Sequence, residues 1–98
     1  MSQPAESKDK AAATPRSITV TVLLFSVLRE HTGCHRMRLH LPEPATAADV
    51  LDELARRFPV VDRYRPVLRL AVNEHYEPAS VRLAEGDEVA LITPVSGG

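Results

Sequence analysis

The reactive side chains of this 98-residue chain are scattered in no pattern that builds an active site. Cys34 beside His35 suggests an activated thiolate, but a lone cysteine after a glycine turn is more often an inert thiol. Asp49, Asp52 and Glu53 fall on the polar side of a predicted helix and are expected to be solvated. The four histidines lack a metal-ligand spacing, and no phosphate-binding loop or nucleophile elbow is present. The side chains therefore predict neither a self-sufficient catalytic site nor a metal site.

The C-terminal sequence Val95-Ser96-Gly97-Gly98 offers a different reactive group, the main-chain carboxylate. Two terminal glycines arise by chance in roughly one chain in 200. Glycine has no Cβ, so such an arm fits a narrow channel and adopts backbone angles that other residues avoid. Five residues beyond Thr93 extend roughly 17 Å, which is enough to cross the wall of another protein's cleft. We therefore expect the Gly98 carboxylate to be the working group, although a tail without function is the alternative.

The elements that would position this tail begin with a strand from Ser17. Alternating apolar residues point to one face of this strand, and its other face becomes apolar at Leu23 and Phe25. We expect these two residues either to contact a partner or to pack under the next element. That element is a short helix from Val27, which ends at Gly33.

The following segment predicts a second strand and the main helix. Arg36 to Leu41 alternates again and is expected to pair antiparallel with the first strand. Thr46 suits the N-cap of a helix, with Asp49 as the acid of a capping box. Pro59 ends this helix. Its apolar stripe comprises Ala47, Val50, Leu51, Leu54, Ala55 and Phe58.

The C-terminal third predicts a connector and three further strands. Residues 60–66, with room for a helical turn, are expected to connect the helix to a strand over Leu68–Val72, followed by a turn at 73–74. A short strand over 81–83 precedes a turn at 85–87. The last strand, Glu88–Val95, has apolar residues on both faces, which is typical of a central strand.

This order of elements predicts an α+β protein with a β-grasp, or ubiquitin-like, fold. One main helix packs on a mixed sheet of about five strands, and the first and last strands lie side by side in its middle. The predicted boundaries are a disordered extension over 1–16, a domain over 17–95 and a flexible tail over 96–98.

Composition and charge narrow the class of protein further. The net charge of −1 gives no reason to expect nucleic acid or an anionic membrane as a partner. No apolar run is long enough to span a bilayer, no secretory signal is apparent, and one cysteine excludes an internal disulfide framework. We therefore expect a cytoplasmic protein.

Lysine is confined to one part of the sequence. Both lysines, Lys8 and Lys10, lie in the N-terminal extension, whereas residues 17–98 contain nine arginines and no lysine. A general bias toward arginine is the simpler explanation. The alternative is that a protein with an activated C-terminus benefits from lacking amines nearby.

Several short motifs resemble the MoaD/ThiS family of sulfur carriers, and most of all its molybdopterin synthase small subunits. The likeness covers about residues 18–98. The last six residues, 93–98, resemble the family's ending P-P-V-[ST]-G-G, with Thr93 in place of the first proline. The motifs are Val22-Leu23-Leu24-Phe25, Leu28-Arg29-Glu30 with Gly33, Ala71-Val72-Asn73, Gly86-Asp87-Glu88-Val89-Ala90, and Thr93-Pro94-Val95-Ser96-Gly97-Gly98.

This resemblance implies a mechanism in which the chain carries sulfur and holds no cofactor. An ATP-dependent activating enzyme would adenylate the Gly98 carboxylate, and sulfur would replace AMP to give a thiocarboxylate. The tail, comprising Pro94, Val95, Ser96 and Gly97, would enter the large subunit of molybdopterin synthase in a heterotetramer. There the sulfur would pass to cyclic pyranopterin monophosphate during molybdenum cofactor biosynthesis.

Three alternatives stay open. The chain could carry sulfur for thiamine, cysteine or tRNA thiolation, although the Pro94-Val95-Ser96 context disfavours the thiamine pathway. It could be a ubiquitin-like modifier that joins Gly98 to lysines. It could also be a non-catalytic β-grasp interaction module with an incidental tail.

Overall fold

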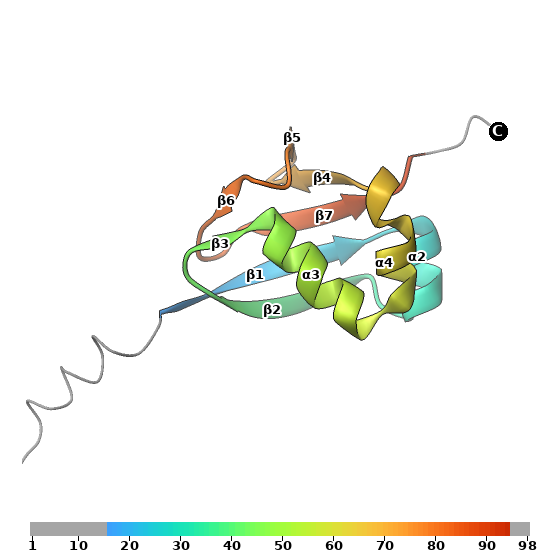
Figure 1. Ribbon diagram of the computed structural model, residues 1–98, viewed down its shortest axis with the longest axis horizontal. Coiled ribbons are helices and arrows are strands. Elements are labelled where there is room, and N and C mark those ends of the chain that lie inside the picture. The colour runs from blue at the N-terminus through green and yellow to red at the C-terminus, as the bar shows by residue number, and fades with distance from the viewer. Residues whose placement is uncertain (1–15, 95–98) are drawn as a thin grey trace, which may run out of the picture.

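The computed structural model of the protein describes residues 16–94, and in these a five-stranded sheet is covered on one face by helices (Figure 1). The spatial order of the strands is β2 (Arg36–Pro42), β1 (Ser17–Leu24), β7 (Glu88–Ile92), β4 (Arg69–Val72) and β5 (His75–Glu77). Two short strands, β3 (Ala45–Thr46) and β6 (Arg82–Leu83), form a separate ladder. The helices are α2 (Ser26–Thr32), α3 (Ala47–Arg57) and α4 (Pro59–Tyr64), with a 3₁₀ turn at Arg65–Val67.

The first and last strands of the described chain lie together in the centre of the sheet. β1 pairs antiparallel with β2 and parallel with β7, and β7 pairs antiparallel with β4. This mixed sheet under one main helix is the β-grasp arrangement that the sequence predicts. β7 runs toward the end of the sheet where α2 and α4 lie, so the chain leaves the sheet at that end (Figure 1).

The core lies between α3 and the covered face of the sheet. Along β1, the alternate residues Ile18, Val20, Val22 and Leu24 are buried, as the period-2 pattern predicts. Leu54 of α3 is fully buried in the same cluster. Burying a Val or Leu side chain completely stabilises a fold by about 1.5–3 kcal/mol, so this layer is a main source of the stability of the domain. The other members from α3 and β7 are Ala47, Val50, Leu51, Val89 and Leu91.

The predicted start of the main helix and the predicted end of the short helix are confirmed. The backbone N–H of Thr46 donates a hydrogen bond of 2.8 Å to the Asp49 carboxylate, which is one half of the predicted capping box. Helix α2 ends at Gly33, which has a φ of 74°, and the Gly33 N–H donates to the Arg29 carbonyl oxygen. Glycine adopts this left-handed conformation without the steric cost of a Cβ.

Other predicted elements differ from the structure. The connector over 60–66 is more helical than predicted because Pro59, which ends α3, also occupies the first turn of α4, where its missing N–H costs nothing. The last strand ends at Ile92, not Val95, because its ladder with β4 stops at the Arg69–Ile92 pair. Strands β3 and β5 were not predicted. They have two and three residues, too few for an alternating pattern to show.

Candidate functional site

The face of the sheet opposite α3 carries a row of apolar side chains. Leu23, Ala90, Ala71 and Tyr76 are successive cross-strand partners from β1 to β5. Directly opposed residues in a ladder project to the same side of the sheet, so these four share one face. We call this the open face.

A pocket of about 370 Å³ lies on the open face. Phe25, immediately before α2, is 44% exposed, and Tyr76 on β5 is 65% exposed. Large apolar groups at this exposure mark binding surfaces when they form one patch rather than lying singly. The residues that line this patch are Leu23, Phe25, Ala71, Glu74, Tyr76, Glu88, Ala90 and Ile92.

Two acidic residues and one arginine lie around the apolar patch. Glu74 and Glu88 line one part of it. The guanidinium of Arg69, opposite Ile92 on the neighbouring strand, lies 4.9 Å from the centroid of the Tyr76 ring. Such a cation–π contact holds the arginine against the aromatic face. The patch thus has an apolar centre and a charged rim, as protein–protein interfaces commonly do.

The structure places both predicted interface residues at this pocket. Leu23 is half-buried and Phe25 is exposed, so neither belongs to the buried core. The alternative that Phe25 packs away under α2 is therefore wrong. Whether the two residues contact a partner stays a prediction.

The pocket also contains residues that the sequence did not single out. Tyr76 was missed because β5 was missed. Its strand is joined to β4 by a two-residue turn in which both Asn73 (φ 50°) and Glu74 (φ 72°) are left-handed. Two left-handed residues define a type I′ hairpin turn, and asparagine favours it. Asn73 was the signal that could have predicted the hairpin, because asparagine tolerates left-handed backbone angles.

The predicted tail begins just after Ile92, a residue that lines the pocket of the open face. Pro94 is exposed and follows Ile92 by two residues. Val95, Ser96, Gly97 and Gly98, including the predicted reactive carboxylate, lie outside the described residues. Because Ile92 lines the pocket, the chain passes from the apolar patch directly into the tail.

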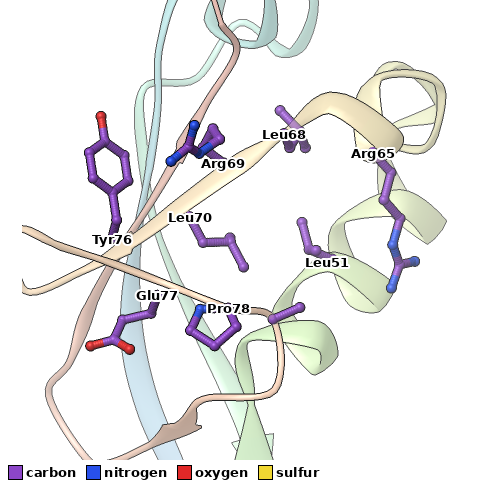
Figure 2. Close-up of a pocket in the computed structure, with 9 residues that line it drawn as sticks. Leu51, Arg65, Leu68, Arg69, Leu70, Tyr76, Glu77 and Pro78 are labelled. Atoms are coloured by element: carbon purple, nitrogen blue, oxygen red, sulfur yellow. The ribbon is translucent and has the colours of Figure 1, made fainter.

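A second pocket lies between α3 and the β4–β5 edge (Figure 2). It measures about 520 Å³, and Leu51, Leu68 and Leu70 form its apolar wall. At its rim, Arg65 donates a hydrogen bond of 2.6 Å to the Asp52 carboxylate. No histidine or cysteine lines it. It therefore offers no thiol and no imidazole base.

The remaining candidate groups do not assemble into a catalytic arrangement in residues 16–94. The Cys34 thiol donates to the Arg36 carbonyl oxygen at 3.3 Å and makes no hydrogen bond to His35 in this part of the chain. His40 shares a 2.8 Å hydrogen bond with the Thr19 hydroxyl. The described residues contain no group of three His, Cys, Asp or Glu side chains that could hold a metal ion.

One acidic group is electrostatically perturbed. Hydrogen bonds from Arg56 and Arg57 lower the pKa of the Glu53 carboxyl below its ordinary value. All three residues lie on the solvent side of α3, remote from the open face. This cluster is an exposed ion-pair network of the helix rather than part of a reactive site. No helix in the described part of the chain is both long and apolar enough to cross a membrane.

The fold and the open apolar face define a ubiquitin-like β-grasp protein. Comparison with known proteins gives its family. The model of the ThiS family matches residues 22–98. The chain therefore belongs to the ThiS family.

Curated and solved relatives agree with this assignment. A protein from Arabidopsis thaliana named "Molybdopterin synthase sulfur carrier subunit" is 40% identical over 84% of this chain and 85% of its own length. The crystal structure of SAMP1 from Haloferax volcanii is 30% identical, with a TM-score of 0.73 over 82% of this chain and 99% of that one. A crystal structure of H. volcanii small archaeal modifier protein 1 is 26% identical, with a TM-score of 0.72 over 80% and 99% of the two chains.

Proposed function

We propose that this chain is the sulfur carrier subunit of a molybdopterin synthase. The observation that carries the proposal is the 40% identity to a relative with that name, over most of both chains. The match to the family model extends through the Gly97-Gly98 ending. In residues 16–94 the side chains offer no competing reactive site, which favours a role for the main-chain carboxylate.

The proposed chemistry takes place at the carboxyl carbon of Gly98. A carboxylate oxygen attacks the α-phosphorus of ATP in an activating enzyme, and pyrophosphate leaves. A sulfur nucleophile then attacks the acyl carbon of this adenylate and displaces AMP, which yields a thiocarboxylate. Activation is needed because a free carboxylate is a poor acyl donor, whereas AMP is a good leaving group. The thiocarboxylate sulfur is finally given to cyclic pyranopterin monophosphate in the large subunit.

The open face is the proposed docking surface for the large subunit. Its apolar centre, which includes Phe25, Tyr76 and Ile92, would become buried against that partner. Exposed aromatic residues at the centre of a patch typically contribute most of the binding free energy. Because the tail leaves the sheet beside Ile92, docking there would direct Gly98 into the partner's active site.

The test is a reconstitution with the full chain, an activating enzyme, ATP and a sulfur donor. We expect the intact mass to rise by about 16 Da as one oxygen is replaced by sulfur. Addition of the large subunit and cyclic pyranopterin monophosphate should then return the mass to its starting value and release a pterin dithiolene. Failure to gain mass with every cognate activating enzyme would contradict the proposal.

A second candidate is a ubiquitin-like protein modifier. The likeness to the small archaeal modifier protein supports it, because that relative shares the fold over 80% of this chain. A modifier would form an amide between Gly98 and a lysine of a target protein. Amide-linked conjugates that form after activation, without a pterin product, would favour this candidate over the first.

A further inference from the structure

The cationic side chains of the folded domain are all arginine. Residues 17–98 contain nine arginines and no lysine, although the chain uses lysine at positions 8 and 10. If the two lysines were distributed at random over the twelve basic positions, both would fall among the first three about one time in twenty. A uniform preference for arginine therefore accounts poorly for the difference between the two parts of the chain.

The contacts of the arginines do not explain the absence of lysine from residues 17–98 either. Four of the nine use the guanidinium group: Arg56 and Arg57 pair with Glu53, Arg65 pairs with Asp52, and Arg69 stacks on Tyr76. The other five are exposed and form no ion pair within residues 16–94. A lysine would supply the same charge at those five positions. They are Arg29, Arg36, Arg38, Arg63 and Arg82.

Lysine and arginine differ most in their reactivity toward acyl groups. The ε-amine of lysine has a pKa of about 10.4, so a fraction is neutral and nucleophilic near pH 8. The guanidinium of arginine stays protonated, with a pKa above about 12, and is not a nucleophile. An activated acyl group held near a lysine would be lost to amide formation, whereas near an arginine it would persist.

We infer that the folded domain excludes ε-amines so that its activated Gly98 does not acylate the domain that carries it. This inference rests on the proposed function, because it requires that Gly98 becomes activated. In the reaction that is prevented, a neutral amine attacks the Gly98 acyl carbon. The C–N bond forms, the bond to the leaving group breaks, and the amine proton passes to water.

Arg69 is the position where an amine would do most damage. It lies opposite Ile92, the last residue of β7, on the neighbouring strand. The six residues after Ile92 extend roughly 20 Å, so the acyl group can reach this side chain. Two groups joined by a short segment of chain meet at an effective concentration on the order of millimolar, far above the micromolar concentration of other molecules in an assay.

Arg82 provides a matched control. It is exposed, lies on β6, and precedes the turn from which β7 starts. β6 therefore lies near the start of β7, whereas Ile92 is at the other end of that strand (Figure 1). A lysine there has the same chemistry as one at position 69 but is much farther from the acyl group.

The test uses the full chain with a C-terminal thioester at Gly98, obtained by thiolysis of an intein fusion. No activating enzyme is involved, so the result does not depend on whether the proposed function is correct. Arg69→Lys and Arg82→Lys are each introduced into a Lys8→Arg/Lys10→Arg background, and thermal unfolding checks that both variants fold. At about 10 µM protein and pH 8, intact mass separates the hydrolysed carboxylate from an internal amide, which is lighter by one water of about 18 Da.

We expect Arg69→Lys to form the internal amide at least tenfold faster than the background protein, which contains no lysine and whose only amine is the N-terminal α-amino group. Arg82→Lys should stay close to the background. Peptide fragmentation should locate the new amide between Gly98 and Lys at position 69. An Arg69→Lys rate equal to that of the background, or of Arg82→Lys, would overturn the inference.

Discussion

The two faces of the sheet use similar residues for different purposes. On the covered face, Val22, Val89 and Leu91 are fully buried beneath α3. On the open face, Leu23, Ala90 and Ile92 alternate with them along the same two strands, yet they line an open pocket. A sheet buried on both faces has apolar residues on both. Here the second face has no covering layer within residues 16–94, which is the reason to expect a partner on it.

The largest expected effect is on the covered face. Leu54→Ala removes a side chain that is 0% exposed and leaves a cavity beneath the sheet. We expect it to lower the free energy of unfolding by about 2–5 kcal/mol, as measured by urea denaturation. Val67→Ala is the control, because Val67 is 51% exposed and should cost less than about 1 kcal/mol. Equal losses in the two variants would contradict the placement of the core.

The sequence predicted the covered face better than the open one. The burial of α3 and β1 follows from regular apolar spacing over 8 to 11 residues, which fixes a single orientation. The pocket depends on strand order and on β5, whose three residues carry no periodic signal. Tyr76 and Leu23 line the same pocket because β7 and β4 join their strands into one sheet, and pairing between distant strands is not encoded locally.

On the open face, a substitution should weaken binding to the large subunit and leave the free energy of unfolding almost unchanged. Phe25→Ala removes an aromatic group from the apolar patch, and we expect at least a tenfold weaker affinity for the large subunit, measured by calorimetry. The free energy of unfolding should change by less than about 1 kcal/mol because the ring is 44% exposed. Arg38→Ala, outside this pocket, is the control. A loss of stability without a loss of affinity would assign Phe25 to the core instead.

A smaller effect is expected where α3 begins. Asp49→Ala removes the acceptor for the Thr46 backbone N–H and should cost about 1 kcal/mol of unfolding free energy. Glu30→Ala in α2 is the control, since Glu30 is exposed and forms no ion pair within residues 16–94. Affinity for the large subunit should be unchanged in both variants. An Asp49→Ala variant as stable as Glu30→Ala would show that the cap contributes little.

The smallest effect concerns the exposed ion pairs of α3. The arginines lower the pKa of Glu53 in the folded protein, so folding favours its charged form. Its contribution is therefore present above the unfolded pKa and is lost as the pH falls through the folded pKa, which is the lower of the two. Glu53→Gln should remove a slight stability advantage at pH 7 and none at pH 2, as measured by thermal unfolding at both values. A larger loss of stability at pH 2 than at pH 7 would show that folding favours the protonated form of Glu53 instead.

The central claim is that Gly98 carries the sulfur. Tandem mass spectrometry of the C-terminal peptide, after incubation with the activating enzyme, ATP and a sulfur donor, tests it most directly. We expect a gain of about 16 Da located on Gly98, and no gain in a variant that lacks Gly98 but retains the unfolding temperature of the parent. A gain located on Cys34 instead, or an unchanged gain in the truncated variant, would contradict it.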